Sequence, residues 1–140
     1  MSNDTAENEL RETHMTEAEL RSFFRGYGDS FLRTEVQIAE FYNVPCITVR
    51  QGVVRLNTTQ EDIRSFFGEV LRRYREQGNT QGELRSLKWE SLGVNSMAAT
   101  ICWAYKNVAR RVLWEWTFTY NLYKGSEGWK ILLQTLHDAA

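Results

Sequence analysis

The sequence predicts an α+β fold in which N-terminal helices pack on a strongly curved antiparallel sheet. The first half of the 140-residue chain carries apolar side chains at helical spacing, and from about residue 82 onward the pattern changes to that of strands. In the segment 112–123 the alternation is strict, and one face carries the large apolar residues Trp114, Trp116, Phe118, Tyr120 and Leu122. We expect a large apolar surface to cover this face, because such alternation indicates a strand with different environments on its two sides.

The first two helices are predicted from start signals that precede apolar residues. Thr16 and Glu19 form the pattern of a capping box, and the residues that follow at helical spacing are Leu20, Phe23, Phe24, Tyr27 and Phe31. Thr34 and Gln37 repeat the pattern for a shorter helix. Pro45 is expected to end that helix, because the residue before a proline is disfavoured in the α region.

The longest helix and the strands complete the predicted order. A third capping box, Thr58 with Glu61, starts the helix, and Gly78 is placed to end it in the left-handed conformation. A small hairpin is predicted at residues 46–50 and 53–56. After the long helix, four strands joined by short turns are expected to form an antiparallel meander at residues 83–93, 97–109, 112–123 and 129–137.

Length and composition indicate one domain and argue against several classes of partner. We expect the polar, acidic residues 1–15 to be a disordered tail and residues 16–140 to form a single domain. The formal net charge of −1 gives no reason to expect nucleic acid or a membrane surface as partner. No apolar run reaches the ~18 residues of a membrane span, and no hydrophobic leader opens the sequence.

The cysteines and the absence of known motifs limit which cofactors and metal sites we expect. Cys46 and Cys102 lie in predicted strands and are interpreted as small buried residues in a reducing compartment, so we expect a cytoplasmic protein. The sequence has neither a cluster of three or four metal ligands nor a glycine-rich phosphate loop. We therefore expect no metal and no cofactor.

Two short segments stand at informative places in this order of elements. Glu-Phe-Tyr-Asn-Val-Pro at residues 40–45 enters the first hairpin, and Gly-Trp-Lys-Ile at residues 128–131 opens the last strand. Over residues 16–138 the chain resembles the nuclear transport factor 2-like superfamily, which includes SnoaL-type polyketide cyclases and ketosteroid isomerases. The resemblance implies a cystatin-like cone, a ligand pocket between the first helix and the concave face of the sheet, and a homodimer formed through the outer sheet face.

The ketosteroid isomerase residues carry over only in part. The tyrosine that polarises the substrate carbonyl in that enzyme falls near Tyr27. Its general-base aspartate falls near Arg50 or Thr48, and its protonated aspartate falls near Thr119 or Tyr120. Neither aspartate is present, and a permanently charged guanidinium cannot serve as a base, so that mechanism is excluded.

The resemblance also suggests which residues line the pocket. His137 has the parity of the strand residues that tend to face the pocket in this superfamily, which here are Trp129, Ile131, Leu133 and Thr135. An imidazole there could act as a general base near neutral pH, with Tyr27 as the second catalytic residue; alternatively, His137 only hydrogen-bonds the rim. The predicted ligand-binding residues are Tyr42, Arg50, Trp103 and Thr135.

Three functions therefore stay open. The first is a SnoaL-like domain that binds a small apolar or amphipathic molecule. The second is an acid–base enzyme of isomerase, cyclase or hydrolase type that uses His137 and Tyr27. The third is a dimeric interaction module with a vestigial pocket. An open apolar pocket with convergent polar groups favours the first two, and a cone filled by side chains favours the third.

Overall fold

The computed structural model describes residues 15–138. The predicted disordered tail at residues 1–15 thus lies outside the described residues, apart from Met15. The side chain of Met15 is 9% exposed and belongs to the hydrophobic core, so the predicted boundary of the tail is wrong at this residue.

The described helices are α2 (Glu17–Ser30), α3 (Glu35–Ala39) and α4 (Gln60–Glu76). The capping box that starts α2 is confirmed, because the Thr16 hydroxyl accepts from the Glu19 amide and the Glu19 carboxylate accepts from the Thr16 amide. These two bonds satisfy amides that have no partner within the helix.

The other two predicted helix starts need correction. The Thr34 side chain makes no capping bond to the backbone of α3, because its hydroxyl donates to the Gln37 side chain instead. In α4 the cap lies one residue later than predicted: the Thr59 hydroxyl accepts from the Asp62 amide at 3.0 Å. The Asp62 carboxylate accepts from the Thr58 amide at 3.1 Å, so a shorter acid performs the role predicted for Glu61.

The predicted helix ends are half confirmed. Gly78 follows the C-cap of α4 with φ +86°, in the left-handed region, as predicted. Pro45 does not end α3, because that helix already stops at Ala39. Pro45 instead lies inside the first strand, where its missing amide removes one bond of the ladder and the pairing with the neighbouring strand shifts register.

The sheet has six strands in the spatial order β2-β1-β6-β5-β4-β3. Their bounds are β1 Tyr42–Arg50, β2 Val53–Asn57, β3 Gln81–Gly93, β4 Ser96–Lys106, β5 Val112–Gly125 and β6 Gly128–Leu136. The hairpin β1–β2 and the meander β3–β6 are antiparallel, as predicted. However, β1 pairs in parallel with β6, so the sheet is mixed and not purely antiparallel. The local sequence gives no signal for the pairing of β1 with β6, because the two strands are far apart in the chain, with α4 and most of the meander between them.

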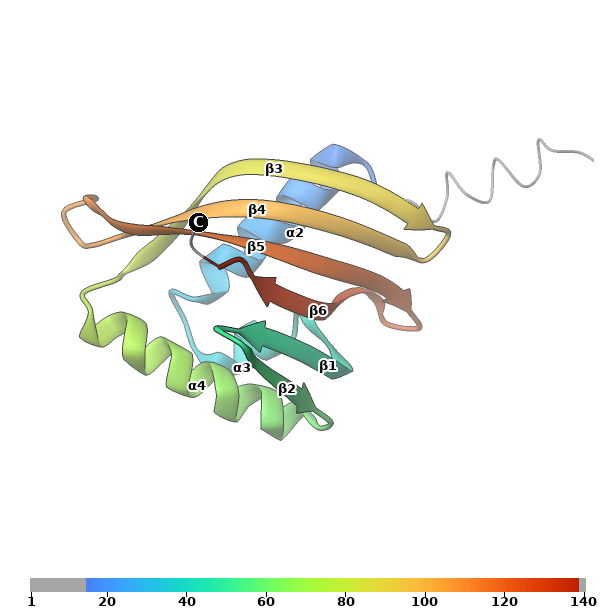
Figure 1. Ribbon diagram of the computed structural model, residues 1–140, viewed down its shortest axis with the longest axis horizontal. Coiled ribbons are helices and arrows are strands. Elements are labelled where there is room, and N and C mark those ends of the chain that lie inside the picture. Colours follow the sequence, from blue (N-terminus) through green and yellow to red (C-terminus); the bar gives the residue numbers. More distant parts are fainter. Residues whose placement is uncertain (1–14, 139–140) are drawn as a thin grey trace, which may run out of the picture.

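The helices lie on one side of the curved sheet. In Figure 1, α2 crosses behind the long strands and α4 lies beside the β1–β2 hairpin. The alternating face predicted for residues 112–123 is confirmed, since Phe118, Tyr120 and Leu122 are at most 2% exposed. They meet Phe24 and Tyr27 of α2 in the core.

A β-bulge in the last strand reverses which side chains face the helices. Asn121 is paired with Leu133 and Leu122 with Ile131, so Leu132 has no partner across the ladder. Beyond this bulge Tyr120 pairs with Gln134, whose side chain is fully buried. Because side chains alternate along a strand, one extra residue moves every later side chain to the opposite face.

Candidate functional site

A small cavity lies between α2 and the concave face of the sheet. Aromatic residues form most of its wall, and the full lining is Tyr27, Gly28, Phe31, Arg50, Tyr74, Asn79, Gly82, Trp103, Tyr105, Phe118, Tyr120 and Gln134. Its volume for the centres of water molecules is about 20 Å³. Roughly 10–15 Å³ by this measure holds one water, so side chains fill most of the cone.

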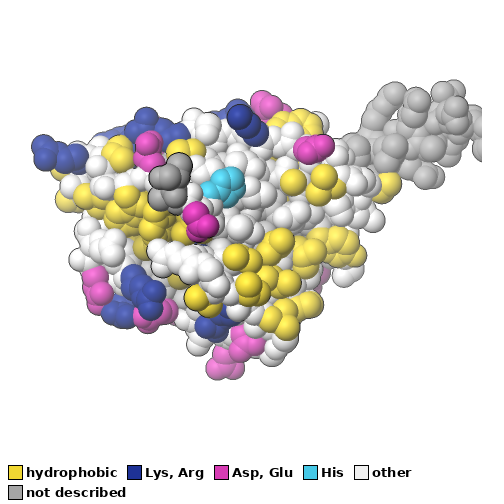
Figure 2. Space-filling view, in the orientation of Figure 1, with side chains coloured by type: hydrophobic (Ala, Val, Ile, Leu, Met, Phe, Trp, Pro, Cys, Tyr) yellow, Lys and Arg dark blue, Asp and Glu magenta, His cyan; other side chains and the backbone are white. Residues whose placement is uncertain are grey.

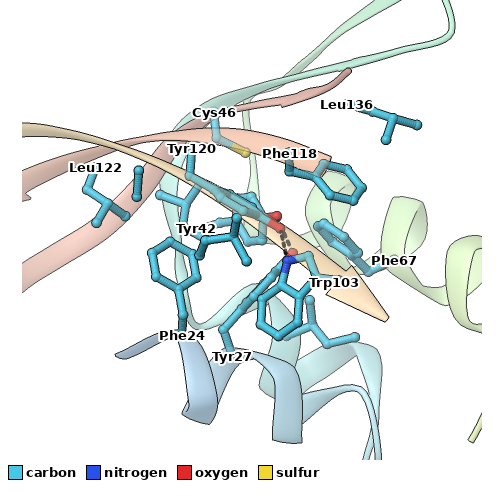
Figure 3. Close-up of a cluster of buried hydrophobic side chains, with 14 of the residues drawn as sticks. Phe24, Tyr27, Tyr42, Cys46, Phe67, Trp103, Phe118, Tyr120, Leu122 and Leu136 are labelled. Atoms are coloured by element: carbon cyan, nitrogen blue, oxygen red, sulfur yellow. Dashed lines mark hydrogen bonds between the residues drawn. The ribbon is translucent and has the colours of Figure 1, made fainter. Parts of the chain in front are cut away.

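Buried hydroxyl, amide and indole groups form a hydrogen-bond network beside this cavity. The Tyr27 and Tyr42 hydroxyls are 2.6 Å apart, and Gln134 Nε2 donates to Tyr42 at 2.7 Å and to Tyr27 at 3.3 Å. Trp103 Nε1 donates to the Tyr120 hydroxyl at 2.9 Å. Figure 3 shows these aromatic side chains turned toward one another from α2 and the sheet.

Burial keeps these phenols neutral. It raises the pKa of the Tyr27, Tyr42 and Tyr120 hydroxyls well above their usual value, because a phenolate is disfavoured away from water. At neutral pH the three groups therefore donate and accept hydrogen bonds but do not act as bases.

The one positive charge in the cavity wall is Arg50, at the end of β1. Its Nε donates to Gln134 Oε1 at 3.1 Å and its Nη1 donates to the Tyr74 hydroxyl at 3.2 Å. Its guanidinium carbon lies 5.2 Å from the ring centroid of Phe118 and 5.5 Å from that of Phe66. Both distances fit cation–π contacts. Within residues 15–138, Arg50 has no carboxylate within 4.0 Å.

Arg50 and Tyr74 also line an open groove, which we call the α4 groove. It runs between α4 and the strands, with a volume of about 720 Å³ for water centres. The groove is lined by Thr48, Arg50, Gln51, Val53, Arg55, Ser65, Phe66, Glu69, Val70, Arg73, Tyr74, Gln77, Trp116 and Leu136. The cavity and the α4 groove thus meet at two shared side chains.

Three of the residues that the sequence predicted for the pocket line the cavity. Tyr27, Arg50 and Trp103 are in its wall, and Tyr42 lies next to the wall, where it is hydrogen-bonded to Tyr27 and Gln134. Whether these residues act on a ligand stays a prediction, but their placement supports a site here.

The predicted positions of His137 and Thr135 are wrong. Thr135 pairs with Thr119, on the sheet face away from the helices, and His137 Nε2 lies 2.7 Å from the Thr119 hydroxyl on that same face. The His137 side chain is exposed on this outer face, which is the face that Figure 2 shows. The bulge at Leu132 is the cause, since it turns the odd-numbered residues that follow it outward, whereas Ile131 before it is buried in the core.

The same bulge explains the residue that the sequence reasoning missed. Gln134 links Arg50 to the tyrosine pair, yet the strict alternation expected for this strand places it on the outer face. A polar residue within an apolar strand was the available signal, but it does not reveal which face the residue occupies.

The lining residues limit the chemistry of the cavity. The wall contains neither an imidazole nor a carboxylate, so the general base that proton transfer requires has no candidate there. Among residues 15–138, no three His, Cys, Asp or Glu side chains are grouped to hold a metal ion. In the same range, no helix has the length and apolar character that crossing a membrane requires.

Comparison with known proteins shows which family the chain belongs to. The model of the family described as NTF2-like protein (DUF6841) matches residues 17–139. Among curated proteins, no match to the sequence was found.

Solved structures share the fold at low sequence identity. An NTF2-like protein with a cystatin-like fold from Novosphingobium aromaticivorans is 15% identical, with a TM-score of 0.71 over 99% of this chain and 90% of that one. The yeast UBP3-associated protein BRE5 is 14% identical, with a TM-score of 0.72 over 91% and 99%. A candidate ketosteroid isomerase from Shewanella frigidimarina is 14% identical, with a TM-score of 0.64 over 83% and 92%. At these identities the likeness shows the fold alone.

Proposed function

We propose that this chain, which belongs to the NTF2-like family described as DUF6841, binds a small amphipathic molecule where the cavity meets the α4 groove. The observation that carries the proposal is the sharing of Arg50 and Tyr74 between the two spaces. They provide polar groups at the junction, and the groove provides apolar walls from Phe66, Val70 and Trp116. A few convergent polar groups in an apolar depression are typical of small-molecule sites.

The sizes of the two spaces determine how such a ligand is accommodated. The cavity has room for about one water, so only a small polar group can enter it without movement of the wall. The body of the ligand must lie in the α4 groove. Acid–base catalysis is not proposed, because the cavity wall has no base.

A groove-filling variant tests the proposal. Ser65 is an exposed residue of α4 that lines the groove, so Ser65→Trp should block it with little effect on the core. Arg64→Trp is the matched control, since Arg64 is also exposed on the same helix but borders a different depression. A library of small amphipathic compounds is screened by thermal shift, and hits are measured by calorimetry.

We expect hits whose affinity falls at least tenfold in Ser65→Trp and is unchanged in Arg64→Trp. If no compound binds the folded protein, or if both variants bind equally well, then the proposed site is wrong.

We also propose that the chain forms a homodimer through its outer sheet face. The supporting observation is an apolar patch on β1, β2 and β6, which we call the hairpin patch: Ile47, Val49, Val54, Leu56 and Leu133. Val54 is 69% exposed and Leu56 is 60% exposed, and apolar side chains gather over these strands in Figure 2. Exposed apolar patches on soluble proteins often mark contacts with a partner.

A further inference from the structure

We infer that the site selects organic anions, with the oxyanion head bound by Arg50 and the apolar body lying in the α4 groove. This inference rests on the proposed function and adds a ligand class to it. The carboxylate is the chemistry argued here, because a guanidinium binds it in a planar, two-point geometry.

The first step is the unbalanced charge of Arg50. A guanidinium stays charged at every accessible pH, and burying a charge without a counter-charge costs free energy. Gln134, Tyr74 and the two aromatic rings hold the group in place but are all neutral. The fold thus fixes a partly buried cation by its Nε and Nη1, and its Nη2 makes no hydrogen bond with any residue in the range 15–138. A ligand carboxylate would supply the missing charge.

The second step is the charge of the groove around it. Arg55 and Arg73 line the groove together with Arg50, and Glu69 is the one acidic residue of the lining. Glu69 is already engaged, because its Oε1 pairs with both Arg72 and Arg73. The groove therefore has an excess of positive charge, which attracts anions and raises their local concentration.

The third step is the arrangement of cations around an aromatic surface. The guanidinium carbons of Arg50 and Arg55 lie 5.5 Å and 5.2 Å from the same ring centroid, that of Phe66. Trp116, Val70 and Leu136 continue the apolar wall. An aromatic or acyl body can thus pack on the wall while its carboxylate remains beside a guanidinium. A rigid polycyclic ligand inside the cone is excluded by the 20 Å³ cavity.

Pairs of compounds that differ only in charge test this inference. We choose 4-phenylbutyrate with 4-phenylbutanamide and octanoate with octanamide, measured by calorimetry on the full chain at low salt. Each acid should bind at least tenfold more tightly than its amide. In Arg50→Gln the preference should disappear, and in Arg64→Gln, a solvent-exposed control on α4, it should persist.

The outcomes separate this inference from the proposed function. If amides bind as tightly as acids, and both are blocked by Ser65→Trp, the site exists but Arg50 is a structural cation–π residue, and the anion inference is overturned. If neither member of any pair binds, the anion inference is overturned, and the library screen with Ser65→Trp decides separately whether the proposed function stands. Should Arg50→Gln not fold, the acid–amide comparison on the unmodified protein decides, and Arg50→Lys tests it again by keeping the charge while losing the planar two-point contact.

Discussion

Gln134 is the residue on which the buried network depends, and its replacement gives the sharpest test of that network. The side chain is fully buried, accepts from Arg50 Nε at 3.1 Å and donates to the Tyr42 and Tyr27 hydroxyls at 2.7 and 3.3 Å. In Gln134→Leu, the Tyr27–Tyr42 contact survives, but the charged donor of Arg50 loses its acceptor. An orphaned charged donor costs about 1.5–3 kcal/mol and each lost neutral bond about 1 kcal/mol, so we expect a loss of ~3–5 kcal/mol in the free energy of unfolding.

Gln134→Glu tests the charge of Arg50 separately from the hydrogen bonds of residue 134, because it keeps those bonds and neutralises the charge. A carboxylate at this position accepts from Arg50 and from the Tyr42 hydroxyl, so the donors keep their partners and the charge of Arg50 is neutralised. We expect stability within about 1.5 kcal/mol of the unmodified protein, the size of one typical hydrogen bond, together with a loss of acid-over-amide preference.

Chemical denaturation followed by tryptophan fluorescence gives the stabilities, and calorimetry gives the preference. A loss below 1 kcal/mol in Gln134→Leu would show that the network contributes little. An undiminished preference for acids in Gln134→Glu would show that Arg50 is not the anion-binding group.

Three further outcomes are expected. Stability should fall as the pH rises above ~10, because burial raises the pKa of the phenols Tyr27, Tyr42, Tyr105 and Tyr120. When the pKa of a phenol is higher in the folded than in the unfolded protein, its contribution to stability is complete below the unfolded-state pKa. Above that pKa the contribution falls by about 1.4 kcal/mol per pH unit for each phenol. Denaturant melts from pH 8 to 11 measure how stability falls with pH, and Tyr105→Phe should make that fall shallower. Leu56→Asp should convert a homodimer to a monomer in sedimentation equilibrium, since it places a charge in the hairpin patch; an unmodified protein that is already monomeric contradicts the proposed interface. His137→Ala should change ligand affinity less than twofold and stability by less than about 0.5 kcal/mol, because its ring is exposed on the outer face; a large loss of affinity would return the imidazole to the site.

The parts of the fold that depend on local pattern could be predicted from the sequence. The aromatic alternation of residues 112–123, the Thr16 capping box and the left-handed Gly78 each follow from neighbours a few positions away. The parallel pairing of β1 with β6 could not, because it depends on which sheet edge is free after the meander has formed.

The residues of the candidate site were likewise predicted only in part from the sequence. Tyr27, Arg50 and Trp103 were identified through family resemblance and lie in the cavity wall. Gln134 was missed because a bulge is a property of two paired strands, and a single strand read alone shows only its own period. That no carboxylate of residues 15–138 lies within 4.0 Å of Arg50 is likewise a property of the assembled site, to which β1, α4, β5 and β6 all contribute.

The unpaired Leu132 also determines which chemistry the cone can host. If β6 kept all its residues but paired with β5 without this bulge, its regular period would turn Thr135 and His137 toward the helices and Gln134 toward the outer face. The cone would exchange an amide that holds a cation for an imidazole that can carry a proton. The choice between an anion receptor and an acid–base site thus depends on where one strand bulges, with every residue of that strand unchanged.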